Sequence, residues 1–242
     1  MAKKKTNGLS RTDHDEADKR TGIRSPLIYE VVRREGDEEL ARPLSSLSWS
    51  GFAAGIALSF SIYGKAFLYT AVGDATWGPV VTNFGYSLGF LMVVMGRLQL
   101  FTENTITAVL PLLADFNRSK LICMVRLWFV VFLTNMAGSF LSTLCAMKVP
   151  ILPDKQIEAV LAISEHLLHY SAYQSLAYGV PAGFIIAALV WLIPAARGSA
   201  FWVIISLTYL ISVGGLTHVV AGSTEWFALA FAGQTSWVHA IV

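Results

Sequence analysis

Two short stretches of the sequence place ionisable and hydroxyl side chains between apolar segments. The first is GRLQLFTENT (residues 96–105), and the second is GGLTHVVAGSTE (residues 214–225). On insertion scales, a charged residue at the centre of a membrane span costs roughly 2.5–3.5 kcal/mol, and such residues usually have a functional or a paired role. The two stretches are therefore the candidate functional sites.

His218 offers the most versatile chemistry in these stretches. It lies between Thr217 and an apolar run, with no carboxylate next to it in sequence. An imidazole there can donate a hydrogen bond or a proton to a passing anion near neutral pH. A lone histidine on an apolar face is usually a packed core residue, but its position in the turn of a broken helix favours a pore residue.

The remaining ionisable residues expected at membrane depth are Lys65, Arg97, Glu103, Arg126 and Glu225. For these a buried ion pair is as good an interpretation as contact with a solute. Arg97 and Glu103 flank the first stretch and are expected to pair or to bond freed backbone groups. Lys65 is expected to find an acid, Glu225 or Glu103. Because losing one partner of a buried pair costs about 3–5 kcal/mol, Glu103→Gln is expected to reduce folded yield more than it alters selectivity.

Metal and enzyme chemistry are not predicted. His166 and His169 form an HxxH pair, but no cysteine and no second histidine pair completes a metal site. Cys123 and Cys145 fall in apolar spans and are interpreted as core residues. Since there is no pairing of a nucleophile with a base, the sequence predicts neither an enzyme nor a cofactor.

The composition indicates a multi-pass membrane protein. Of 242 residues, 55% are hydrophobic and 14% are charged, whereas a soluble domain carries about 25% charged residues. Ten of the 18 Lys/Arg and nine of the 16 Asp/Glu lie in residues 1–45. Because these basic residues are interleaved with acidic ones, no nucleic-acid partner is expected.

Three regions are predicted: a disordered cytoplasmic tail (1–25), an interfacial amphipathic helix (26–45) and a transmembrane pore domain (46–242). The second region is expected to lie at the membrane interface or on the helix bundle, and a plain solvated helix is an equal alternative. Lys and Arg are enriched in alternate loops, which places the N-terminus in the cytoplasm. Full spans are predicted at 47–72, 79–95, 121–147, 171–193 and 200–216, with a loop at 148–168 and short apolar pieces at 104–113 and 223–231. The sequence stops shortly into a possible sixth span, which predicts a truncated sixth helix.

The two stretches would interrupt helices at corresponding positions of two halves. Such paired interruptions are typical of the substrate site in an inverted-repeat transporter. Irregular backbone at membrane depth is tolerated only where protein buries it or it lines a cavity. Two ordinary kinked helices remain the alternative.

Several motifs carry a resemblance to a known family. They are YSLGF (86–90), RLQLFTENTITAVLP (97–111), Arg126 followed by Asn135 and Gly138, and THVVAGSTE (217–225). From about residue 26 to the end, the chain resembles the formate/nitrite transporter family, most closely its YfdC-type branch. The resemblance implies an all-α fold of six membrane helices in an aquaporin-like inverted repeat with helices 2 and 5 interrupted. It also implies a homopentamer in the lipid bilayer of the bacterial inner membrane, with one pore per protomer for a small monovalent anion such as formate, nitrite or hydrosulfide.

The resemblance also implies roles for individual residues. His218 would be the central pore histidine, facing Thr102 of the first break. The other residues implied in the pathway are Leu100 and Phe101 in the first break, Tyr86, Phe90 and Ile211 at apolar constrictions, and Thr217 beside the histidine.

Three positions depart from the anion-conducting members. Leu167 replaces a lysine before the fourth span, Thr217 replaces a glutamate before the histidine, and Gly222 replaces an asparagine four residues after it. The leading hypothesis is a passive or proton-coupled pathway for a small monovalent anion or its neutral acid. A pore for a neutral or cationic solute and a non-transporting membrane scaffold are the alternatives.

Overall fold

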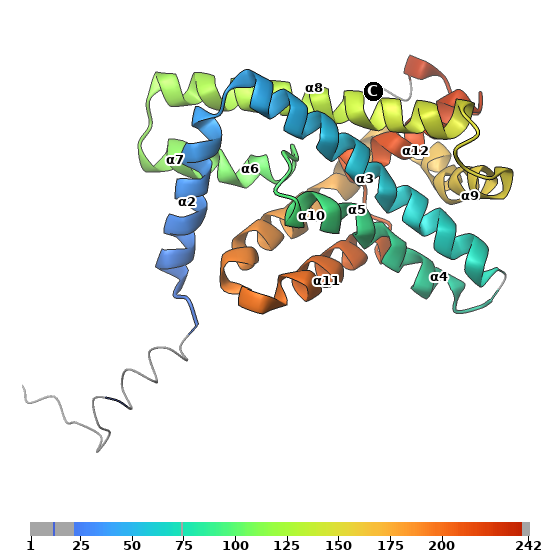
Figure 1. Cartoon of the computed structure of the whole chain (residues 1–242), viewed down its shortest axis with the longest axis horizontal. Helices are drawn as coiled ribbons and strands as arrows, with labels where there is room; N and C mark the ends of the chain where they lie inside the picture. Colours follow the sequence, from blue (N-terminus) through green and yellow to red (C-terminus); the bar gives the residue numbers. More distant parts are fainter. Residues whose placement is uncertain (1–11, 13–21, 74, 239–242) are drawn as a thin grey trace, which may run out of the picture.

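The structure is a computed structural model of the chain that describes residue 12, residues 22–73 and residues 75–238. Regular secondary structure in these ranges is entirely helical (Figure 1). Most of the predicted tail and the last four residues, where the truncated sixth helix was expected to continue, lie outside the described residues.

Four helices in the described ranges are long and apolar enough to cross a membrane. Each matches a predicted span to within a few residues. They are α3 (Leu44–Val72), the continuous run of α4 (Gly78–Thr82), η1 (Asn83–Gly85) and α5 (Tyr86–Met95), α8 (Arg118–Lys148), and α10 (Ala172–Leu192) with η3 (Ile193–Ala195). The predicted loop at 148–168 is wrong in part, because it contains the helix α9 (Asp154–Ser164), followed by η2 (Glu165–His169).

Both predicted helix interruptions are present. The first, residues 96–103, separates α5 from α6 (Asn104–Thr107) and α7 (Val109–Ala114). The second, residues 214–218, separates α11 (Ala200–Val213), which follows η4 (Arg197–Ser199), from α12 (Val219–Phe231). Each contains one residue in the left-handed region, Arg97 at φ 50° and Gly215 at φ 61°. The helix after the second break starts four residues earlier than expected, since His218 forms its N-cap.

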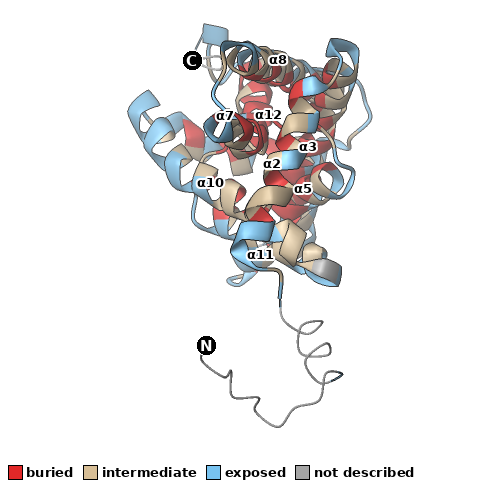
Figure 2. Cartoon of the chain, turned by 90° about the vertical axis from the view of Figure 1, so that its left-hand side faces the viewer, coloured by how far each residue is buried: buried red, intermediate tan, exposed pale blue. Residues whose placement is uncertain are grey.

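The long helices α3 and α8 lie side by side in the bundle (Figure 1). Glycines allow this approach, because a Cβ at Gly138 would collide with the carbonyl oxygen of Phe52 and one at Gly55 with that of Asn135. Small residues at helix interfaces are the usual means of close packing in membranes. Buried residues gather along the inner faces of α3, α5 and α12 (Figure 2).

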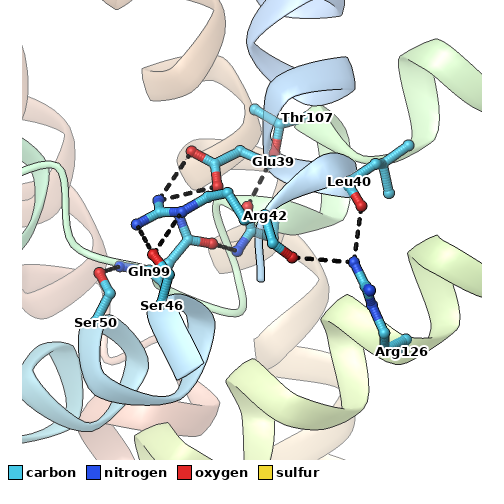
Figure 3. A network of polar contacts seen from close by, with 9 residues as sticks. Glu39, Leu40, Arg42, Ser46, Ser50, Gln99, Thr107 and Arg126 are labelled. Carbon is cyan, nitrogen blue, oxygen red and sulfur yellow. Dashed lines mark hydrogen bonds and ion pairs between the residues drawn. The ribbon is translucent and has the colours of Figure 1, made fainter. Parts of the chain in front are cut away.

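The helix predicted from residue 26 corresponds to α2 (Ser25–Ala41), which packs on the bundle beside α6, α7 and α8. Its placement at a membrane interface stays a prediction. A Cβ at Gly36 would collide with the carbonyl oxygen of Thr107, so α2 and α6 are in close contact. Arg126 Nη2 of α8 donates to the carbonyl oxygens of Leu40 (2.8 Å) and Arg42 (3.2 Å) at the end of α2 (Figure 3). Arg126 thus caps a helix C-terminus.

Arg33 forms ion pairs along α2 itself, while Glu35 and Asp37 of this helix lie 3.5 Å from Arg97 and 3.6 Å from Lys120 of other segments. Arg33 bonds Glu30 (2.9 Å) one turn before it and Asp37 (2.6 Å) one turn after it. Hydrogen bonds from Arg33 and Arg34 lower the pKa of Glu30 to about 2. The buried face of α2 packs on the helices that follow the first break.

The close contact between α3 and α8 predicts that a larger side chain at the interface lowers the stability of the protein. Gly138→Ala should destabilise the protein by about 1–3 kcal/mol, because the new methyl group overlaps a backbone carbonyl that cannot move alone. Gly183→Ala in α10 is the matched control: its Cβ meets nothing within 4 Å, and alanine favours a helix by about 1 kcal/mol over glycine. The midpoint of thermal unfolding in detergent measures both. Equal midpoints would contradict this account of the contact.

Candidate functional site

His218 and Thr102 bring the two interruptions together. The imidazole Nε2 lies 2.8 Å from the hydroxyl oxygen of Thr102, and His218 is buried. On its other side, Nδ1 accepts a hydrogen bond from the backbone N–H of Ala221 (3.2 Å), which caps α12. Because Nδ1 is an acceptor here, the neutral imidazole carries its proton on Nε2 and donates it to Thr102 Oγ1. The Thr102 hydroxyl hydrogen then remains available to a solute.

Aromatic side chains of α5 lie against the histidine. The ring of Phe90 meets the imidazole edge-on, with centroids 5.2 Å apart, and Tyr86 follows at 5.3 Å from Phe90. Phe90 and Tyr86 are buried, as are Leu100 of the first break and Ile211 of α11. The polar pair therefore sits in an apolar shell formed by residues from α5, α11 and the first break.

The other two residues expected beside the pathway contact neighbouring helices. Phe101 packs edge-on against Phe132 of α8, with ring centroids 5.2 Å apart. Thr217 Oγ1 donates to the backbone carbonyl oxygen of Ser175, which ties the second break to α10. These contacts hold the residues immediately before Thr102 and His218.

Asn135 of α8 holds the first break in place. Its Oδ1 accepts from the N–H of Phe101 (2.9 Å), and its Nδ2 donates to the carbonyl oxygens of Gln99 (2.9 Å) and Gly51 (2.8 Å). One buried amide thus satisfies three backbone groups, two of them in the break. In the sequence, Asn135 stood out only as part of a motif. A single amide in an otherwise apolar span was the signal that could have revealed this role.

A second network joins the first break to the N-terminal helix (Figure 3). Gln99 accepts through Oε1 from Asn104 Nδ2 (2.9 Å) and donates from Nε2 to Glu39 Oε2 of α2 (2.8 Å). The N–H of Gln99 donates to Ser50 Oγ of α3 (3.0 Å). The loop that carries Thr102 is therefore bonded to α2, α3 and α8.

Buried hydroxyl groups position α12 on the other side of the site. Ser223 Oγ donates to Ser139 Oγ (2.8 Å), and Thr224 Oγ1 lies 2.9 Å from Ser139 Oγ and donates to Ser59 Oγ (3.1 Å). These residues come from α3, α8 and α12. No motif in the sequence predicted this cluster, because serine and threonine are common in membrane helices and only the fold brings these four together.

The predicted pair of Arg97 and Glu103 is wrong. Arg97 is 85% exposed at its side chain, and its Nη2 lies 3.5 Å from Glu35 Oε1 of α2. Glu103 Oε1 is buried without a hydrogen-bond partner among the described residues. Arg97 adopts a left-handed backbone conformation just after the end of α5, and its side chain lies outside the bundle. The expected loss of yield in Glu103→Gln therefore loses its basis.

Of the two acids predicted to pair with Lys65, Glu225 lies near it but forms no ion pair with it. Lys65 forms no ion pair within the described part of the chain, and its Nζ lies 5.9 Å from the ring centroid of Tyr86. Glu225 is close enough to interact electrostatically with Lys65. Its Oε1 is buried and has no hydrogen-bond partner in the described ranges.

A cavity of about 890 Å³ adjoins the polar pair. Its walls come mainly from α8, α10 and α12, and Thr102, Thr217 and His218 contribute polar groups to them. Most of the other lining residues are apolar. A few placed polar groups in an apolar concave surface are typical of a site for a small molecule.

A bundle of membrane-spanning helices in which two interrupted helices meet at a buried histidine defines a membrane transport protein. The chain belongs to the formate/nitrite transporter family, since the family model "Formate/nitrite transporter" matches residues 26–242. This confirms the resemblance noted in the sequence. The chain is therefore a multi-pass membrane channel or transporter.

Two curated relatives and a solved structure support this assignment. Inner membrane protein YfdC of Escherichia coli (strain K12) is 35% identical over 214 residues, covering 88% of this chain and 69% of that protein. Formate channel FocA of Haemophilus influenzae is 28% identical over 194 residues, covering 74% of this chain and 64% of that protein. A structure described as "Pentameric formate channel with formate bound" has a TM-score of 0.66 at 20% identity, covering 82% of this chain and 87% of that one. The predicted all-helical fold is confirmed, and the inverted-repeat symmetry stays a prediction.

The three bonds of Asn135 predict a strong dependence of the site on this amide. Asn135→Ala should destabilise the protein by about 2 kcal/mol or more, because it leaves buried backbone groups without partners. The matched control is Asn117→Ala at the N-cap of α8, which loses one bond to the N–H of Lys120 and should cost about 1 kcal/mol. Thermal unfolding in detergent compares the two variants. A cost for Asn135→Ala no larger than that of the control would contradict the role assigned to this amide.

Proposed function

We propose that the chain forms a passive pathway for a small monovalent anion or its neutral acid, with His218 and Thr102 at its polar centre. The observation that carries the proposal is the hydrogen bond between these residues, which leaves one hydroxyl hydrogen free. The names of the relatives, a formate channel and a pentameric formate channel with formate bound, support a solute of the formate class. They do not favour a neutral or cationic solute or a scaffold.

The geometry favours hydrogen-bond donation over proton donation by the imidazole. To give up the Nε2 proton and stay neutral, His218 would need a proton on Nδ1, which already accepts the N–H of Ala221. A protonated Nδ1 would face that N–H as a second donor and would lose the cap of α12. We infer that His218 orients Thr102 and that the solute acquires its proton from water outside the constriction.

The apolar shell supplies the rest of the mechanism. Phe90 and Tyr86 on one side and Leu100 and Ile211 nearby strip water from a passing solute. A neutral acid crosses such a shell at a lower cost than its anion, because a charge in an apolar environment is poorly solvated. The Thr102 hydroxyl then offers a hydrogen bond to a carbonyl or nitrogen-oxide oxygen at the narrowest region.

The assembly and location follow the same relatives. We propose a homopentamer in a bacterial inner membrane, with residues 1–45 in the cytoplasm and residues 46–242 forming the pore domain. The word "pentameric" in the description of a solved relative and "inner membrane" in the name of another support this proposal. The ten Lys and Arg residues in residues 1–45 also favour a cytoplasmic segment.

A pentamer should be visible by mass. Native mass measurement of the full chain in a mild detergent is expected to give five times the 26.4 kDa of the protomer. A ring is expected because apolar outer faces of the protomer can be covered by neighbouring copies as well as by lipid. A uniform monomer under conditions in which the protein remains folded would refute this assembly.

The proposed polar centre predicts a distinct pattern of variants in proteoliposomes loaded with formate or nitrite. Flux should rise as the external pH falls from about 8 to about 5, because more of the solute is then protonated. Thr102→Val removes the donor at nearly constant volume and should reduce flux by about tenfold or more, a loss comparable to about 1.4 kcal/mol. Thr102→Ser keeps the hydroxyl and should retain most of the flux.

Variants of His218 provide the second arm of this experiment. His218→Phe should lose flux and the hydrogen bond that orients Thr102, whereas His218→Asn retains a donor and should keep a weaker flux. Ammonium and glycerol serve as cationic and neutral solutes and should not be carried. If His218→Phe and Thr102→Val both transport like the parent at every pH, His218 is a packed core residue and the proposal fails.

A further inference from the structure

A second, smaller pocket lies away from the polar pair. Its volume is about 230 Å³, and it is formed by the end of α3, the start of the span that contains α4 and η1, and Ile163 of α9. Lys65 and Asn83 supply its nitrogen-bearing side chains. A water molecule occupies about 30 Å³ of liquid, so the pocket has room for a small solute with several waters.

Lys65 is a cation without a direct counter-ion in this pocket. It is half-buried, and no hydrogen bond or ion pair of its ammonium group occurs within the described ranges. Its three N–H donors therefore have water or a ligand as their available partners. Glu225 interacts with Lys65 electrostatically, yet it does not line the pocket. A lysine placed in this way is a point charge suited to an anion.

Asn83 adds a directed donor to the same pocket. Its Oδ1 accepts from Ser212 Oγ of α11 (2.7 Å), which fixes the orientation of the amide. The Nδ2 group then presents two N–H donors that have no partner among the described residues. The ammonium group and the amide line a pocket that has no carboxylate among its described lining residues, and the hydroxyls of Tyr69 and Thr82 in the same lining can donate as well as accept. Such a lining suits a small anion.

The pocket is linked to the polar centre through aromatic rings. Lys65 Nζ lies 5.9 Å from the ring centroid of Tyr86, Tyr86 lies 5.3 Å from Phe90, and Phe90 lies 5.2 Å from His218. Tyr86 and Phe90 thus form a chain of ring contacts from Lys65 to the histidine. Leu167 lines the large cavity and not this pocket. It is the residue that replaces the lysine expected before the fourth span.

We propose that the Lys65 pocket binds a small monovalent anion and loads the pathway ahead of the aromatic constriction. This inference rests on the proposed function. It assigns the first step, the electrostatic attraction of the anion, to Lys65 of α3. One lysine near a narrow entrance raises the local concentration of anions without having to enter the constriction. The pocket is also too small for a large organic anion, so it selects for size as well as charge.

The test is the dependence of formate and nitrite flux on solute concentration in proteoliposomes of the full chain. Lys65→Met should raise the apparent KM about tenfold and leave the maximal flux within about twofold of the parent. Lys65→Arg keeps the charge and should restore a KM close to that of the parent. Lys155→Met, at an exposed position of α9 that does not line the pocket, removes the same charge and should have no effect. An unchanged KM in Lys65→Met would overturn the proposal.

Two further measurements keep the test decisive. If Lys65→Met fails to fold, Asn83→Asp places a carboxylate in the pocket at nearly constant volume and should raise KM, and an unchanged KM there would again overturn the proposal. If the parent carries no anion, the proposed function fails. The site is then tested alone by the rise in thermal unfolding midpoint on adding nitrite in detergent. A rise in the parent that Lys65→Met abolishes supports the pocket, and no rise in the parent refutes it.

Discussion

The bundle depends on how backbone groups are satisfied where α5 and α11 are interrupted. Lipid offers no hydrogen bonds, so an opened helix must find its partners within the protein. At the first interruption the partner is Asn135, which bonds Phe101, Gln99 and α3 through one amide. At the second it is His218, whose ring accepts the N–H of Ala221. The two breaks can face each other because each is held by a side chain already buried in the bundle.

This solution to the backbone problem also sets the chemistry of the site. Since Nδ1 of His218 is committed to capping α12, only Nε2 faces Thr102. The imidazole therefore acts as a fixed donor to Thr102, and the hydrogen of the Thr102 hydroxyl remains available to a solute. Because His218 caps α12 and also bonds Thr102, it cannot easily change protonation without disturbing the helix. In the proposed pathway, the neutral acid is thus the form of the solute that suits the constriction best.

The sequence was sufficient for the features that depend on local pattern. Hydrophobic length predicted four of the five expected full spans, and glycine with ionisable residues predicted both interruptions. The fifth, 200–216, is wrong in length, because α11 (Ala200–Val213) ends at the second interruption and is too short to cross alone. The sequence failed where the outcome depended on which groups the fold brings together. Arg97 and Glu103 are close in sequence, but the left-handed turn at Arg97 separates them and pairs Arg97 with α2. The three bonds of Asn135 and the hydroxyl cluster around Ser139 join segments far apart in sequence, and no periodicity encodes them. Helix α9 was missed because its charges were interpreted as those of a loop.

The positions of the charged residues explain how an anion pathway can exist with a neutral centre. Arg97 is exposed beside α2, Arg126 caps the end of α2, and Lys65 stands beyond Tyr86 and Phe90 from the histidine. No basic side chain other than His218 lines the large cavity in the described part of the chain. A fixed cation at the narrowest region would hold an anion tightly and slow its exit, because conduction requires binding weak enough to release the solute. In the proposed pathway, the Lys65 cation recruits the anion before the constriction, and the dipoles of His218 and Thr102 assist its passage through it.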